Sequence, residues 1–229
     1  RAPSRFSWRD PDAYFFDRLP NRTALLKLCR NLEFALGKNE YGGAFRGKNG
    51  YIFSNENTDE AVLARNLAAL AAFAETVDAP LYTALVPSKT DALPGLLPPL
   101  YTAERDALWA AAKTAHGAVD LLPTLRMRGG EGKYIYYRGD HHLTSLGAYY
   151  VCRALAAPLG FPAAEAADFS VSVVRADFAG SDARRLLTDT GDDRIALFRA
   201  RGDSAVTVTA DGSTRRGLYD FDALAGDDA

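Results

Sequence analysis

Apolar residues recur at every third or fourth position in four stretches of the chain, which is the period of a helix with one buried face. In the first stretch Leu25, Leu28 and Leu32 fall on one face. The second opens with Asn57 and Glu60 at the spacing of a capping box, in which each side chain bonds a backbone N–H of the other. Helices are therefore predicted over residues 23–34, 57–77, 102–116 and 144–159.

Short runs that are almost wholly apolar occupy residues 81–86 and 117–122, on either side of the predicted helix over residues 102–116. Such runs are typical of strands buried on both faces, so the strand–helix–strand order predicts a parallel sheet covered by helices. Earlier, residues 41–53 read as two short strands around Lys48-Asn49-Gly50. Asn-Gly tolerates positive φ angles, which predicts a type I′ turn there.

After Pro162 the pattern changes to strict alternation. Residues 169–174 alternate between apolar and polar, while residues 195–198 and 205–209 flank a turn at Arg201-Gly202-Asp203. This is the pattern of strands and hairpins. The predicted fold class is α/β: a three-layer sandwich with a mostly parallel sheet, and a β-rich insertion after about residue 165.

Composition supports one globular domain over residues 1–229, since 48% of residues are hydrophobic and 24% are charged. The net charge of −2 gives no reason to expect a nucleic-acid partner. The longest apolar stretches fall short of the ~20 residues that span a bilayer. Cys29 and Cys152 can form at most one bridge, and two partly buried thiols that act as small hydrophobes are the favoured interpretation.

Both ends of the chain suggest a longer protein. The chain opens at Arg1 and its only methionine is Met127, so we expect a preceding segment: a signal peptide, an anchor, or residues trimmed for expression. Residues 222–229 have neither a core strand nor an element terminator. We therefore expect the domain to continue beyond Ala229.

The densest polar cluster lies at residues 136–149 and holds two of the three histidines. Asp140 and His142 are two positions apart, so on an extended segment their side chains point to the same face. An aspartate placed this way can accept from one imidazole nitrogen and leave the other free as a base. Thr144 is a good N-cap, and a helix dipole starting there would help to keep His142 neutral, as a general base requires.

Two other interpretations of this cluster stay open. Asp140, His141 and His142 are metal-ligand types, but adjacent residues of a strand point to opposite faces, so we expect no metal site. Alternatively, Asp140 caps the turn and both histidines have a structural role. Spacing alone does not decide between a structural and a catalytic role.

The run Tyr-Tyr-Arg-Gly-Asp-His-His-Leu-Thr-Ser-Leu-Gly-Ala-Tyr at residues 136–149 resembles the signature of the bacterial DHHW proteins, relatives of the SGNH-hydrolase-like alginate O-acetyltransferases. Residues 46–53 and 85–89 are similar to the "GKdGwlF" and "VPsK" segments of that family. Residues 176–181 and 218–220 also fit its later part. Leu143 stands where the family has Trp, a position that supports the site by packing. The resemblance implies a permuted SGNH-hydrolase-like fold.

The same resemblance assigns the site residues. Asp140 and His142 match the catalytic Asp-x-His pair, as orienting acid and base, and Tyr137, Arg138 and His141 would line the cleft. The nucleophilic serine of this family follows on a late strand, in a segment like "kDSya" that does not occur before Ala229. Gly202-Asp203-Ser204 spells the start of a "GDS" motif, but Ser204 leads into a strand run and is predicted to be a turn residue.

The implied function is O-acetyl transfer, or O-acetyl ester hydrolysis, on a cell-surface polysaccharide. It would use a Ser-His-Asp triad whose serine lies beyond this chain, and no cofactor. Family members are expected outside the cytoplasmic membrane, secreted or anchored, often beside a membrane-bound O-acyltransferase that delivers the acyl group. The alternative is a non-catalytic surface module that binds glycan in the same cleft.

Overall fold

The N-terminal part of the chain forms a helix and a small antiparallel sheet. The computed structural model describes residues 18–99, 101 and 105–220. Helix α2 (Arg22–Ala35) precedes a sheet of the strands β1 (Glu40–Tyr41), β2 (Ala44–Arg46) and β3 (Ile52–Ser54), in that order. Between β2 and β3, Asn49 and Gly50 have φ angles of 56° and 76°, and the Tyr51 N–H donates to the Lys48 carbonyl at 3.1 Å. The predicted type I′ turn is confirmed.

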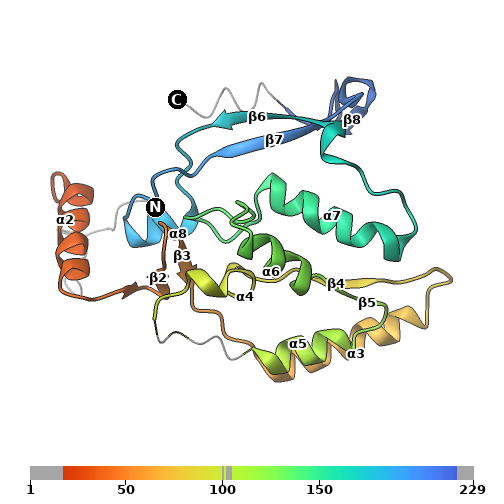
Figure 1. Cartoon of the computed structure of the whole chain (residues 1–229), viewed down its shortest axis with the longest axis horizontal. Helices are drawn as coiled ribbons and strands as arrows, with labels where there is room; N and C mark the ends of the chain where they lie inside the picture. Colours follow the sequence, from red (N-terminus) through yellow and green to blue (C-terminus); the bar gives the residue numbers. More distant parts are fainter. Residues whose placement is uncertain (1–17, 100, 102–104, 221–229) are drawn as a thin grey trace.

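Strands β4 (Thr83–Leu85) and β5 (Ala118–Asp120) pair in parallel. The connection between them ends in helix α5 (Asp106–Lys113), which lies beside α3 (Glu60–Ala74), as Figure 1 shows. The strand–helix–strand unit is therefore confirmed. The expected burial of both strands is wrong, because most of their residues are half-buried or exposed and Leu85 is 36% exposed.

The start of α3 differs from the predicted capping box. The N-cap is Asp59, whose carboxylate accepts a hydrogen bond from the Val62 N–H at 3.0 Å, and the helix ends at Ala74 instead of residue 77. Asp59 has extended backbone angles, so its short side chain already satisfies the free N–H of the first turn. Asn57 and Glu60 therefore do not cap each other.

The main core lies between the N-terminal sheet and the helices α4 (Lys89–Ala92), α6 (Leu122–Gly130) and α7 (Ser145–Leu159), with the short helix η1 (Pro94–Leu96) after α4. Its buried residues come from segments far apart in the sequence: Phe45, Tyr51, Phe53, Ala92, Leu93, Leu97, Leu125, Ile135 and Tyr136. Ile135 and Tyr136 therefore fix the start of the polar cluster at residues 136–149 in the core.

Helix α7 follows the prediction closely. The Thr144 side chain accepts from the Gly147 N–H at 3.1 Å, which is the expected N-cap. The helix ends where Gly160 adopts a φ of 74°, the left-handed conformation that favours glycine.

The chain after residue 165 is rich in strands, as predicted. It contains η2 (Ala166–Asp168), β6 (Phe169–Arg175), α8 (Ser181–Leu186), β7 (Ile195–Ala200), η3 (Asp203–Ala205), β8 (Thr207–Ala210) and β9 (Ser213–Arg216). The pairing differs from the sequence pattern, because β7 pairs with β6 across α8, while β8 pairs with β9. The β6–β7 ribbon lies beside α7 (Figure 1). Phe169 and Phe198 of this ribbon both pack on Tyr149 of α7, which stabilises this non-local pairing.

The fold is mixed α/β with small sheets. Within the described residues β4–β5 is the only parallel pair, so the three-layer sandwich stays a prediction. No helix among these residues is both long and apolar enough to cross a bilayer. Cys29 and Cys152 are both free and exposed, so the expectation of partly buried thiols is wrong.

Candidate active site

The residues of the polar cluster form a tight loop before α7. Tyr136 and Leu143 form an isolated antiparallel bridge, and the Tyr137 N–H donates to the His142 carbonyl at 3.2 Å. The loop between them bends and carries Asp140, which is 5% exposed, at its inner side. The predicted extended backbone is therefore limited to the two ends of the loop.

Asp140 and His142 are in direct contact, as predicted. His142 Nδ1 lies 2.6 Å from Asp140 Oδ1, and the His142 backbone N–H donates to the same oxygen at 3.0 Å. The imidazole itself is largely exposed, while the carboxylate is buried. Asp140 thus orients the ring through Nδ1. Among the described residues, no group hydrogen bonds to Nε2 of His142.

Ser181, which the sequence analysis did not single out, holds the second oxygen of Asp140. Its backbone N–H and its Oγ both donate to Oδ2, at 2.8 and 3.0 Å. Gly180 makes this approach feasible, because a Cβ there would lie 2.4 Å from the Asp140 Cβ. Burial alone would raise the pKa of Asp140, but the hydrogen bonds from Ser181 and His142 hold that pKa well below its usual range.

His141 lies beside His142 instead of pointing away from it. The two ring centroids are 3.9 Å apart, and His141 Nδ1 lies 3.3 Å from Ser181 Oγ. The expected divergence of neighbouring side chains is wrong, because the loop is bent at these positions. Candidate ligand atoms of Asp140, His141 and His142 lie within 4.8 Å of one another and could contact one metal ion. Both oxygens of Asp140 are already engaged by N–H and O–H donors.

A buried lysine holds the loop by hydrogen bonds to its backbone carbonyls. Lys89, which is 3% exposed, donates to the carbonyls of Tyr137, Arg138 and Asp140 at 3.2, 3.0 and 2.8 Å. Its ammonium also lies 3.5 Å from a carboxylate oxygen of Asp182. Burial lowers the pKa of Lys89 to about 8, although Asp182 opposes this effect. Lys89 belongs to the "VPsK" segment, but no sequence pattern indicated this contact.

Asp193, which lies between α8 and β7 in the sequence, also holds this loop. No sequence pattern had indicated a role for it. Its carboxylate, 1% exposed, accepts from the backbone N–H groups of Arg138 and Gly139 at 2.7 and 2.6 Å. The Tyr134 hydroxyl also donates to it, and burial is the main reason that the pKa of Tyr134 is raised. Lys89 and Asp193 together fix the backbone that positions Asp140.

A cleft of about 480 Å³ lies beside the histidines. It is lined by Glu56, Leu85, Val86, Pro87, Ser88, Arg105, Trp109, Tyr136, His141, His142 and Leu143. Residues 85–88 continue from the C-terminal end of β4, which is the edge where open α/β sheets bind ligands. Leu143 lines the cleft and also packs on the core, in agreement with its expected supporting position.

Tyr137 and Arg138, which were expected to line the cleft, pack elsewhere. The Tyr137 ring lies 4.9 Å from that of Phe178. The Arg138 guanidinium lies 5.1 Å from the centre of the Tyr134 ring and donates to the Asp192 carbonyl at 3.1 Å. Of the three residues predicted for substrate binding, only His141 is brought to the cleft.

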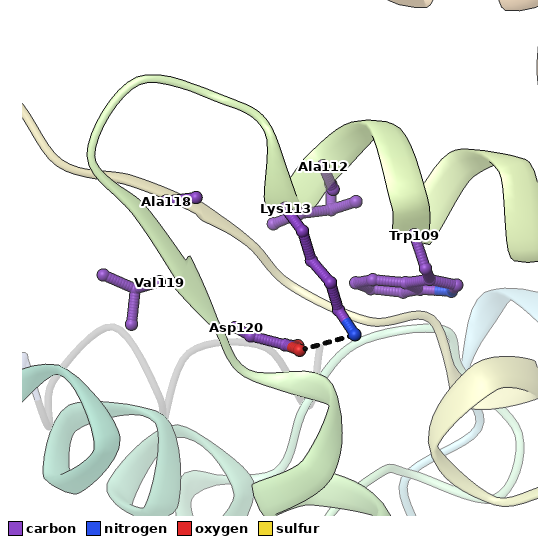
Figure 2. Close-up of a pocket in the computed structure, with 7 residues that line it drawn as sticks. Trp109, Ala112, Lys113, Ala118, Val119 and Asp120 are labelled. Atoms are coloured by element: carbon purple, nitrogen blue, oxygen red, sulfur yellow. Dashed lines mark ion pairs between the residues drawn. The ribbon is translucent and has the colours of Figure 1, made fainter.

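One part of the cleft wall was missed by the sequence analysis. There Arg105 pairs with Glu56, and its Nε lies 3.4 Å from a carboxylate oxygen of the buried Asp91. Trp109 lines both the cleft and a smaller pocket of about 210 Å³. Figure 2 shows the smaller pocket. In that pocket the Lys113 ammonium points toward Asp120, at 3.3 Å.

Comparison with known proteins identifies the family. Residues 45–216 match the family described as SGNH hydrolase-like domain, acetyltransferase AlgX. The chain belongs to this family. No curated protein sequence matches the chain.

Solved structures show that this SGNH-hydrolase-like fold is shared. PatB1 of Bacillus cereus, in a structure with a sulfonyl adduct, is 16% identical with a TM-score of 0.62, covering 78% of this chain and 65% of PatB1. A DHHW family protein from Eubacterium siraeum is 21% identical with a TM-score of 0.55, covering 69% of this chain and 57% of the other. The O-acetyltransferase domain of Pseudomonas putida AlgJ is 22% identical with a TM-score of 0.54, covering 69% of this chain and 66% of that domain. The resemblance to the DHHW proteins is thereby confirmed.

Within this SGNH-hydrolase-like domain, the hydroxyl groups nearest the site have other partners. Ser88 Oγ donates to Asp91 at 2.8 Å, and Ser181 Oγ donates to Asp140. Ser204 lies in η3, between β7 and β8, and does not line the cleft. The described residues therefore provide an imidazole that Asp140 orients at an open cleft, and no hydroxyl among them hydrogen bonds to its Nε2.

Proposed function

We propose that this protein transfers acetyl groups to, or removes them from, the hydroxyls of a cell-surface polysaccharide. A Ser-His-Asp triad would do so, with the serine supplied by sequence outside residues 1–229. The observation that carries this proposal is the 2.6 Å contact between His142 Nδ1 and Asp140 Oδ1, with Nε2 left to act at the cleft. The family match to an acetyltransferase domain supports the same chemistry.

The first half of the reaction forms an acetyl-enzyme. The serine Oγ attacks the carbonyl carbon of an acetyl ester donor while His142 Nε2 takes the hydroxyl proton. The new Oγ–C bond forms, the bond from that carbon to the donor oxygen breaks, and His142 gives the proton to the departing oxygen. Asp140 keeps Nδ1 protonated and stabilises the transient imidazolium.

The second half delivers the acetyl group. A sugar hydroxyl attacks the acetyl carbon, and His142 Nε2 takes the hydroxyl proton. The bond from the acetyl carbon to the serine Oγ then breaks, and His142 returns the proton to that oxygen. If water attacks instead, the same steps hydrolyse the ester.

The wider setting is part of the proposal. We place the protein outside the cytoplasmic membrane, secreted or anchored, with a membrane-bound O-acyltransferase as the source of the acyl group. The parallel pair β4–β5 would belong to a larger, mostly parallel sheet in a three-layer sandwich. One related structure supports this type of reaction, since the matching part of Pseudomonas putida AlgJ is an O-acetyltransferase domain.

Turnover of p-nitrophenyl acetate tests the base. We use the intact protein, meaning residues 1–229 with the sequence that flanks them in the native protein. His142→Ala should lower kcat by roughly 10²–10⁴-fold, since general-base assistance is lost. The control is His116→Ala, because His116 is exposed and does not line the cleft. Equal rates for both variants would contradict the proposal.

A covalent probe tests the nucleophile without turnover. An aryl sulfonyl fluoride should sulfonylate the activated serine: its Oγ–S bond forms, fluoride leaves, and His142 takes the proton. PatB1 has been solved with a sulfonyl adduct. Peptide mass spectrometry should locate the label outside residues 1–229, and His142→Ala should abolish it. A protein that binds glycan but takes no label would support a non-catalytic surface module instead.

A further inference from the structure

Among the described residues of the cleft wall one guanidinium is present, and two carboxylates lie against it. Among the described lining residues Arg105 is the one Arg or Lys, and its side chain is 16% exposed. Glu56 pairs with its Nη1, and Asp91, 2% exposed, lies 3.4 Å from its Nε. A guanidinium that pairs with one carboxylate and lies within ion-pair distance of a second offers little attraction to a further anion.

The charges around the cleft favour cations over anions. Besides Arg105, the charged groups described at the cleft wall or directly behind it include three carboxylates, those of Glu56, Asp91 and Asp140. Lys89 is turned toward loop carbonyls and Asp182, and Lys113 in the adjoining pocket is paired with Asp120 (Figure 2). A carboxylate on the ligand would therefore meet more negative than positive charge.

The other described residues of the cleft lining are apolar or uncharged. Leu85 and Val86 are 36% and 48% exposed, and Leu143 and Trp109 continue the same lining. The C–H faces of a sugar ring can pack on such a surface, whereas a carboxylate placed there would lose its hydration without a partner. The unpaired Nε2 of His142 is left to receive a hydroxyl proton.

From these observations we infer that the acceptor bound beside His142 is a polymer of uncharged hexopyranose units and not a polyuronate. This inference rests on the proposed function for the choice of a carbohydrate ligand. It adds the substrate class: Glu56 and Asp91 neutralise Arg105 and thereby select against acidic sugars.

Two hexamers that differ only at C6 test the inference. β-1,4-linked mannohexaose carries a hydroxymethyl group where the β-1,4-linked mannuronate hexamer carries a carboxylate. Calorimetric titration of the intact protein at low ionic strength should show mannohexaose binding about tenfold more tightly or better. Added salt should strengthen binding of the mannuronate hexamer, because it screens repulsion.

Glu56→Gln should shift the preference toward the mannuronate hexamer by about tenfold, since Arg105 then keeps only Asp91 as a partner. Glu131→Gln is the matched control, because it removes the carboxylate that pairs with Arg128 on an exposed surface outside the cleft. For this control variant, the ratio of the two dissociation constants, for mannohexaose and for the mannuronate hexamer, should equal that of the wild type.

Tighter binding of the mannuronate hexamer that weakens with salt would overturn the inference, as would binding of neither hexamer. These wild-type results do not depend on whether the variants fold. Binding is measured without turnover, so failure of p-nitrophenyl acetate hydrolysis would count against the proposed reaction alone. The binding ratio would still decide the acceptor class.

Discussion

Four hydrogen bonds from Ser181 and His142 lower the pKa of Asp140. Its pKa is depressed in the folded protein, so it contributes stability above the unfolded-state pKa near 4, and that stability is lost as the pH falls toward the folded-state pKa. Asp140→Asn should therefore lower the free energy of unfolding by about 1–3 kcal/mol near neutral pH. Urea unfolding should show this gap closing below about pH 4. A gap independent of pH would contradict the assignment.

Lys89 is the second residue that decides the geometry of the site. Lys89→Met removes the donor to three loop carbonyls and leaves Asp182 buried without its ammonium partner. We expect a loss of about 3–5 kcal/mol in unfolding free energy, the usual cost of breaking a buried ion pair. The downfield proton resonance of His142 Nδ1–H should also broaden or vanish.

Lys48→Met is the control for this change. Lys48 is exposed and its ammonium donates to a single carbonyl, that of Gly95. Its loss should alter stability by no more than about 0.5 kcal/mol and leave the His142 resonance in place. Similar effects of the two substitutions would mean that Lys89 does not hold the loop.

At the scale of elements, α8 matters because its first turn carries Ser181 to Asp140. In Gly180→Ala the new Cβ would lie 2.3 Å from the Gly139 carbonyl oxygen, so α8 must shift away from the loop. We expect about 1–3 kcal/mol of destabilisation and a fall in p-nitrophenyl acetate turnover.

Gly95→Ala is the matched control, since no atom lies within 4 Å of a Cβ at Gly95 and its φ is not positive. Both readouts should stay at their wild-type values in this variant. If Gly180→Ala also had wild-type stability and wild-type p-nitrophenyl acetate turnover, the close contact between α8 and the loop would not be needed for the site.

At the scale of the whole molecule, the two cysteines lie on separate helices, α2 and α7, and are free and exposed. We expect iodoacetamide to alkylate Cys29 and Cys152 in the native protein without denaturant, as peptide mass spectrometry can measure. Because these two thiols form no disulfide, adding reductant should not change the Tm through them. Protection of either thiol, or a peptide joining the two, would contradict the structure.

Features that depend on a few neighbouring residues could be predicted from the amino-acid order. The two-residue spacing of Asp140 and His142, the Thr144 cap of α7 and the Asn49-Gly50 turn are all local, and each is present in the structure. The family resemblance also came from contiguous motifs, so it could be recognised before any fold was known.

The distant residues that complete the site could be identified from the three-dimensional packing alone. Ser181 is 41 positions from Asp140, Lys89 is 51 positions away, and Asp193 lies 55 positions after Arg138. The Arg105–Glu56 pair spans 49 positions. Strand β7 pairs with β6 although α8 lies between them in the sequence. No periodicity or spacing rule links residues so far apart, because their contacts depend on how the loops and helices pack in three dimensions.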